Sequence, residues 1–161
     1  EPPRSLRLVV ALPDIYKVST MEARKILPKE IPLSSMVKNV ARASTMIAAI
    51  MDGDIELFGK AMDDEVVEPI RAKLIKGYSE VKLAAKRSGA SGVTISGSGP
   101  AMLAIVDVER ASPQKVAASM AQAFKREHVS CKTFVSKVGR GLVDSSGRSP
   151  LRTDRDGLPS I

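Results

Sequence analysis

Residues 92–100 read GVTISGSGP and lie between two short apolar segments, 93–96 and 101–106. Both segments have the length and composition of β-strands, and Gly-Ser-Gly-Pro between them is a turn signal. We therefore expect two adjacent strands with an unusual connection. Gly97 and Gly99 can adopt positive φ and expose backbone N–H groups. This suits either close approach to a phosphate or a compact hairpin, and composition alone leaves both interpretations open.

The glycine pattern differs from the known nucleotide-binding fingerprints. Gly92 and Gly97 have the spacing of a Walker A loop, but Ser98-Gly99 follows in place of Lys-Ser/Thr. A dinucleotide-binding loop that starts at Gly97 would require glycine where the chain has Met102. The stretch is thus an irregular hairpin or a functional loop of another kind.

Strands are also expected near both ends of the chain. Residues 6–12 alternate along a strand with one well-buried face, and residues 132–138 read as a final strand. The expected buried face of the first strand consists of Leu6, Leu8, Val10 and Leu12.

Helices fill the intervals between these strands. The longest is expected to begin with Ser34 or Ser35 as its N-cap and to end at Gly53. We expect its apolar stripe to face the core, and the stripe consists of Met36, Val40, Ala43, Ile47 and Ile50. Shorter helices are expected after Thr20, after Asp54, within 68–77, after Ser79 and after Ser112-Pro113.

The order of elements predicts the fold class. One strand, several helices, two strands, a helix and a last strand indicate an α+β, ferredoxin-like antiparallel sheet covered on one side by helices. The domain is expected to span residues 1–138. Residues 139–161 are rich in Gly, Ser, Pro and charges, which predicts a polar, flexible tail.

Composition excludes several classes of function. No apolar run reaches the roughly 20 residues of a transmembrane helix, so no membrane association is expected. The net charge is +7, but basic residues alternate with acids and the chain has no Trp, which argues against nucleic-acid binding. Cys131 is the single cysteine, which favours a reducing compartment.

Three other features are expected to be structural. The consecutive acids Asp63, Asp64 and Glu65 lack further spaced ligands and read as a solvated helix end, so no metal site is predicted. His128 and Cys131 have no partners at catalytic or ligand spacing. No catalytic residue is therefore assigned within this chain.

TISGSGP at residues 94–100 resembles the C-terminal glycine-rich motif of the galactokinase, homoserine kinase, mevalonate kinase and phosphomevalonate kinase (GHMP) superfamily. Two further stretches are similar to the homoserine kinase family within it. These are STMEARKILPKEIPLSSMVKNVARA at 19–43 and VVEPIRAKLIKGYSEVKLAA at 66–85. The resemblance covers roughly residues 5–138 and implies a kinase C-terminal domain.

The resemblance implies an activity and a substrate site. It implies ATP-dependent phosphorylation of the homoserine hydroxyl to O-phosphohomoserine in threonine biosynthesis, with Mg²⁺. Arg24 and Arg71 match arginines that hold the amino-acid carboxylate, and Thr20 lies beside the first. Guanidinium groups suit this role because they can bind a carboxylate through two parallel hydrogen bonds. Ser96, Gly97, Ser98 and Gly99 match a loop that supports the phosphate site.

The family's Pro-x-x-x-Gly-Leu-Gly-Ser-Ser loop does not occur in this chain. The resemblance therefore implies that ATP and Mg²⁺ are bound mainly by an N-terminal half, and that this piece alone is inactive. The expected partners are homoserine and that N-terminal domain, with a homodimer left open. The expected location is the cytoplasm, with the plastid left open. The alternatives are a mevalonate-type kinase of the superfamily and a non-catalytic amino-acid-binding module.

Overall fold

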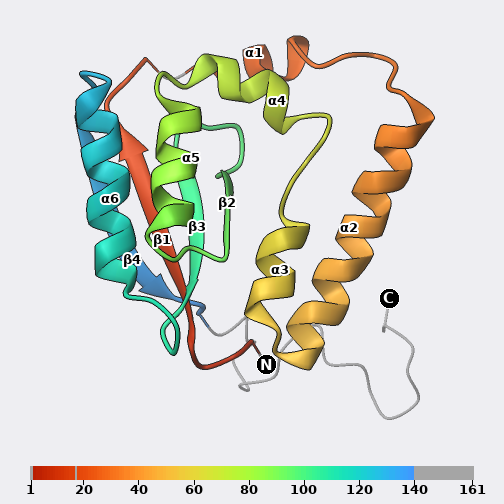
Figure 1. Ribbon diagram of the computed structural model, residues 1–161. Coiled ribbons are helices and arrows are strands. Elements are labelled where there is room, and N and C mark those ends of the chain that lie inside the picture. The colour runs from red at the N-terminus through yellow and green to blue at the C-terminus, as the bar shows by residue number, and fades with distance from the viewer. Residues whose placement is uncertain (1, 17, 140–161) are drawn as a thin grey trace, which may run out of the picture.

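The computed structural model describes residues 2–16 and 18–139 (Figure 1). The predicted tail at 139–161 lies outside the described residues, except for Gly139. None of the helices in the described part is long and apolar enough to cross a membrane.

In the described part of the chain, four antiparallel strands form one sheet. They are β1 (Leu6–Pro13), β2 (Gly92–Ile95), β3 (Met102–Asp107) and β4 (Cys131–Lys137), in the spatial order β2-β3-β1-β4. The first strand in the chain is thus central, with β3 on one side and β4 on the other. This arrangement confirms the predicted α+β, ferredoxin-like class.

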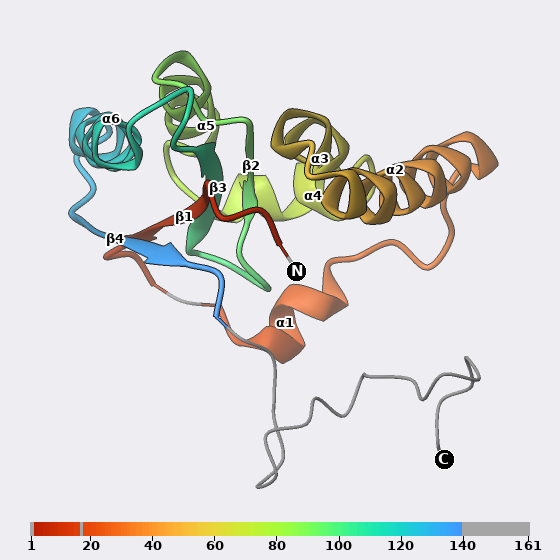
Figure 2. The ribbon, with the colours of Figure 1, turned by 90° about the horizontal axis from the view of Figure 1, so that it is seen from below.

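Two helices cover one face of the sheet. They are α5 (Tyr78–Arg87) and α6 (Pro113–Arg126), which lie side by side on the same side in both views (Figures 1 and 2). The N-cap of α6 is Ser112, whose side chain accepts a hydrogen bond from the Lys115 N–H, as its sequence position predicts. The largest fully buried side chains are Phe124, Met102, Ile105, Met120, Val9, Val81, Val93, Val106 and Val116.

The buried face of β1 is the reverse of the predicted one. Val9 and Ala11 are fully buried in the main core, whereas Leu12 is 43% exposed. The reason is tertiary: α5 and α6 cover the face that carries Val9 and Ala11. The predicted face is covered only near its start, where Leu6 and Leu8 join a second apolar cluster.

That second cluster is built by a helix pair beside the sheet. The pair comprises α2 (Leu33–Asp52) and α3 (Ile55–Ala61), joined by Gly53, whose φ of 76° suits a left-handed helix end (Figure 1). The Asp54 side chain accepts a hydrogen bond from the Leu57 N–H at 2.9 Å, which confirms the predicted cap of α3. Apolar side chains from the pair pack against Leu6 and Ile105 of the sheet.

Two predictions for α2 are wrong. The helix begins after Pro32, with no side-chain cap, and not after Ser34 or Ser35. Its predicted core-facing stripe is largely exposed: Val40 is 59% and Ile47 is 63% exposed. The helix packs through its other side, where Ala49 is fully buried. The covered side also carries the half-buried polar residues Asn39 and Arg42, so the periodicity located the apolar stripe but not the side of the helix that this domain covers.

Three short helices complete the described chain. They are α1 (Thr20–Lys25), α4 (Glu68–Arg71) and the 3₁₀ turn η1 (Ala72–Leu74). At the start of α1, the Ser19 side chain accepts from the Glu22 N–H at 3.1 Å and Glu22 accepts from the Ser19 N–H at 3.0 Å. This reciprocal capping box fixes an otherwise marginal six-residue helix.

Candidate functional site

The glycine-rich stretch is a hairpin connection at the end of β2. The Ser96 N–H donates to the Ala101 carbonyl at 2.8 Å, and the Gly99 N–H donates to the Ser96 carbonyl at 3.1 Å. Gly97 and Gly99 have φ values of 61° and 84°, which L side chains rarely adopt. The two expected strands and their special connection are thus present.

The two glycines face different surroundings. A Cβ on Gly99 would lie 3.3 Å from methyl groups of Ile75 and Ile95, whereas a Cβ on Gly97 would meet no atom within 4 Å. In the described part of the chain, neither the Gly97 N–H nor the Ser98 N–H donates to a protein acceptor. Gly99 is therefore packed against protein, while Gly97 and Ser98 offer free donors to a ligand.

Gly92 has a packing role. A Cβ on Gly92 would lie 2.6 Å from the Gly59 Cα, and a Cβ on Gly59 would lie 2.3 Å from the Ser91 carbonyl carbon. Helix α3 therefore touches the start of β2 backbone to backbone. This contact explains a glycine at position 92 without any phosphate.

Arg71 lies against the glycine-rich loop. Its Nη1 donates to the Gly97 carbonyl at 3.0 Å, across 26 residues of sequence. Its Nε is buried and has no acceptor within the described residues, and no described carboxylate forms an ion pair with it. A buried donor without a partner is costly, so this guanidinium can still gain from an anionic ligand.

Within the described residues, Thr20 and Arg24 make no hydrogen bond with the loop. Both lie on α1 and are exposed. Helices α1 and α4 overlap in Figure 1, but Figure 2 shows α1 on the side of the sheet away from α5 and α6. Of the predicted site residues, Arg71 is therefore joined to the loop by a hydrogen bond, and within the described residues no such bond links Thr20 or Arg24 to it.

The sequence analysis did not predict a polar cluster that lies near Arg71 in the chain. Its centre is Glu68, which is 7% exposed and accepts hydrogen bonds from the Tyr78 hydroxyl, the Lys82 ammonium and the Thr94 hydroxyl. One signal could have revealed it. Lys82 shares a helical face with the buried Tyr78 and Ala85, four residues before it and three after it, and a lysine on such a face requires an acidic partner.

Two groups of this cluster, the Lys82 ammonium and the Tyr78 hydroxyl, have shifted pKa values. Burial alone would lower the pKa of Lys82, but its hydrogen bonds to Glu68 and Asp63 outweigh burial and raise it. Burial and the hydrogen bond to Glu68 raise the pKa of the Tyr78 hydroxyl. Lys82 is therefore a fixed cation at neutral pH, and Tyr78 a fixed neutral donor.

The acidic turn after α3 is held by protein partners, which corrects the expectation of a merely solvated helix end. Asp63 pairs with Lys82 at 3.0 Å, and Glu65 pairs with Lys38 of α2 at 3.0 Å. Asp64 accepts from the Val66 N–H at 2.7 Å and from the Asn39 side chain at 2.8 Å. In the described residues, no group of His, Cys, Asp or Glu could hold a metal ion.

His128 and Cys131 have structural surroundings. His128 has a φ of 59° directly after α6, where a left-handed residue ends the helix. Cys131 is half-buried, and burial raises the pKa of its thiol, which disfavours the reactive thiolate.

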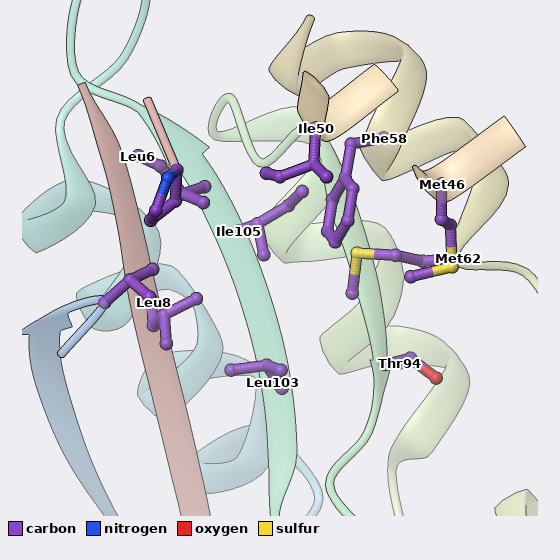
Figure 3. A pocket seen from close by; sticks show the side chains of 11 residues that line it. Leu6, Leu8, Met46, Ile50, Phe58, Met62, Thr94, Leu103 and Ile105 are labelled. Carbon is purple, nitrogen blue, oxygen red and sulfur yellow. The ribbon is translucent and has the colours of Figure 1, made fainter. Parts of the chain in front are cut away.

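An apolar cavity of about 410 Å³ lies between the sheet and the helix pair (Figure 3). Leu8 and Leu103 on the strands point toward Phe58 and Met62 on the helical side. Its walls are apolar except for Thr94, so it does not suit an amino-acid carboxylate. The residues that line it are Pro2, Leu6, Leu8, Met46, Ile50, Phe58, Met62, Thr94, Leu103, Ile105 and Val138.

Comparison with known proteins identifies the family. The family described as "GHMP kinases C terminal" matches residues 46–127, about half of the 161 residues. The chain belongs to the GHMP kinase family. The matched range includes the glycine-rich loop, Arg71 and the Glu68 cluster, which are therefore parts of a GHMP kinase C-terminal domain.

Several homoserine kinases are similar to this GHMP kinase domain. That of Pyrococcus furiosus is 41% identical over 135 residues, and that of Methanococcus vannielii is 46% identical over 140 residues. These alignments cover 84% and 86% of the chain. The crystal structure of a homoserine kinase from Cytophaga hutchinsonii superposes with a TM-score of 0.74 at 35% identity and covers 85% of the chain.

The domain is shorter than these relatives. It spans 44% of the P. furiosus protein, 43% of the M. vannielii protein and 43% of the C. hutchinsonii chain. The similarity therefore concerns somewhat less than half of each relative.

Proposed function

We propose that this chain is the C-terminal, substrate-binding half of a homoserine kinase. The observation that carries the proposal is the 38 to 46% identity to homoserine kinases over most of the chain. The contact of Arg71 with the Gly97 carbonyl supports it, because a cation beside a loop with free N–H groups suits a substrate that is an amino acid and becomes a phosphate ester.

Arg71 is assigned to the substrate carboxylate. One donor of the guanidinium is used by the loop carbonyl, and the remaining donors can bind a carboxylate. Arg24, with Thr20 beside it, is proposed as the second carboxylate ligand. Within the described residues Arg24 makes no hydrogen bond with Arg71 or the loop, so this assignment predicts that the two arginines contact the same carboxylate only when substrate binds.

Residues Ser96, Gly97, Ser98 and Gly99 are proposed to support the phosphate site. The free N–H groups of Gly97 and Ser98 can donate to oxygens that gain negative charge as the phosphoryl group moves from ATP to the homoserine hydroxyl. Mg²⁺ supplies charge neutralisation to such phosphates when bound, but no cluster in the described residues fits it. We therefore assign the metal and most ATP contacts to an N-terminal half.

The N-terminal half is also the proposed cover for the exposed side of α2. The exposed apolar residues of α2 include Leu33, Val37, Val40, Ile47 and Met51, all at helical spacing. A large exposed apolar stripe normally marks a surface that other protein covers. The relatives are more than twice as long as the aligned part, which leaves ample chain to cover this side.

The chain alone is then expected to be inactive and to bind ATP feebly. Isothermal calorimetry with ATP checks this division, and tight binding by the 161-residue chain would contradict it. The cytoplasm, or the plastid in a photosynthetic host, is the proposed location, and cell fractionation tests it. A homodimer is compatible with this assignment, and light scattering measures it.

Replacing Arg71 tests the carboxylate assignment. In the full-length kinase, Arg71→Ala is expected to raise the KM for homoserine at least tenfold, because a charge-assisted pair is lost. The KM for ATP should change less than twofold. Arg87→Ala, at an exposed arginine of α5, is the matched control and should change neither value.

A normal homoserine KM in Arg71→Ala would overturn the carboxylate assignment. A substrate panel then tests the activity itself. If the full-length protein prefers a mevalonate-type hydroxy acid, the assigned substrate is that acid and not homoserine. If the protein transfers phosphoryl groups to no alcohol, a non-catalytic amino-acid-binding module is favoured.

A further inference from the structure

Glu68 occupies the point where three elements meet. One carboxylate oxygen, Oε1, accepts hydrogen bonds from Tyr78 and Lys82 of α5. The other, Oε2, accepts from the Thr94 hydroxyl of β2 at 3.1 Å. Since Glu68 is the first residue of α4, this one side chain joins α4 to both α5 and β2.

The cluster is close along the chain to both residues of the contact between Arg71 and the loop. Arg71 is the last residue of α4, three residues after Glu68. Thr94 precedes the loop residue Ser96 by two positions on β2. The two segments that Glu68 ties together are therefore the same two that carry the Arg71 guanidinium and the Gly97 carbonyl.

Stability alone does not explain a buried carboxylate here. Well-packed apolar residues often replace a buried ion pair with no loss of stability, because desolvation offsets most of the attraction. The charged cluster adds orientation, because two donors of α5 and one of β2 fix the position of the carboxylate. In addition, the Lys82 ammonium is shared with Asp63 at 3.0 Å, which ties the end of α3 to the same point.

We propose that Glu68 is a positioning residue for Arg71: by tying α4 to α5 and β2, it sets the place of the guanidinium relative to the glycine-rich loop. The inference rests on the proposed function, in which Arg71 binds the substrate carboxylate. Glu68 itself does not touch the substrate. It acts on binding through Arg71.

Glu68→Gln in the full-length kinase tests this role. The amide keeps the length of the side chain but places an NH₂ donor against one of the three existing donors. The expected result is a roughly tenfold higher KM for homoserine with less than a twofold change in the KM for ATP. Val116→Ala, a buried substitution on α6, is the control for general destabilisation and should change neither KM.

A double-mutant cycle shows whether Glu68 acts through Arg71. Once Arg71 is replaced by Ala, the further change Glu68→Gln should raise the homoserine KM less than twofold. If Glu68→Gln keeps its full tenfold effect in that background, the positioning role is wrong. Thr94→Val removes a single hydrogen bond and should raise the homoserine KM about threefold, so it decides the matter if Glu68→Gln fails to fold.

Hydrogen exchange separates this inference from the proposed function. In Glu68→Gln, the hydrogen-bonded amides of residues 70–75 and those of Ser96 and Gly99 should exchange faster than in the parent protein, whatever the substrate is. Faster exchange in a protein that does not phosphorylate homoserine would refute the proposed function and leave the structural link. Unchanged exchange together with an unchanged homoserine KM would refute the positioning role and leave the proposed function.

Discussion

Gly97 and Gly99 have similar backbone conformations but different surroundings, and this gives a residue-scale prediction. Alanine at either position has a left-handed φ, which costs about 1 kcal/mol or more. At Gly99, the new methyl would also press on Ile75 and Ile95 at 3.3 Å. We expect Gly97→Ala to lower the free energy of unfolding by about 1 kcal/mol and Gly99→Ala by about 2 kcal/mol.

Urea unfolding of the two variants measures this difference. Gly139→Ala is the control, because a Cβ at Gly139 would meet no atom within 4 Å and its φ is not in the left-handed range. Equal losses at Gly97 and Gly99 would show that the contacts with the two isoleucines do not matter.

The loop also shows what sequence can and cannot predict at a single residue. Its two glycines with positive φ follow from the turn chemistry of Gly-Ser-Gly-Pro. Its contact with Arg71 does not follow, because the two residues are 26 positions apart and meet only once the sheet has formed. The assignment of Arg71 to the site came from family resemblance, and the role of Glu68 was visible only through the fold.

At the scale of elements, Asp64 joins α2 to the start of α4. Burial alone would raise its pKa, but hydrogen bonds from the Val66 and Val67 N–H groups and from Asn39 outweigh burial and lower it. A carboxyl whose pKa is lowered on folding stabilises the protein above its unfolded value, near 3.8. That contribution is lost as the pH falls through the lower, folded pKa.

Asp64→Asn should therefore be less stable than the parent at pH 6 by about 0.5 to 1 kcal/mol, and this gap should shrink below pH 3.8. Urea unfolding at pH 6, 4 and 3 checks it. Asp52→Asn, at the exposed end of α2, is the control and should show a smaller gap at pH 6. A gap that stays constant down to pH 3 would mean that the charge of Asp64 is unimportant.

The elements differ in how well the sequence predicted them. The strands and α6 were placed to within about one or two residues, because period and caps agree there. The facing of β1 and α2 was wrong. Leu8 and Ile47 are apolar, but which apolar face is covered depends on elements far away in sequence.

At the scale of the whole molecule, the exposed side of α2 gives a further prediction. Val40→Lys with Ile47→Lys should change the free energy of unfolding of the 161-residue chain by less than about 0.5 kcal/mol, because both side chains are exposed. In the full-length kinase, the same pair should lower the Tm by several degrees, because the N-terminal half is proposed to cover this side.

The control is Leu83→Lys, at an exposed leucine of α5 outside the α2 stripe. This substitution should change neither the free energy of unfolding of the 161-residue chain nor the Tm of the full-length kinase. If the α2 pair affects the 161-residue chain and the full-length kinase equally, the cover is not the N-terminal half.

The central place of β1 has a consequence for how this domain is made. Among the four strands of this sheet, β1 is synthesised first, yet its partner β3 follows about 90 to 100 residues later and β4 later still. During that delay, its valines and leucines have no strand beside them. Such long-range pairing slows folding, since loop closure precedes any gain from contact. The helices that lie between these strands in sequence can form earlier, but the sheet can be completed only after the end of the domain has been synthesised.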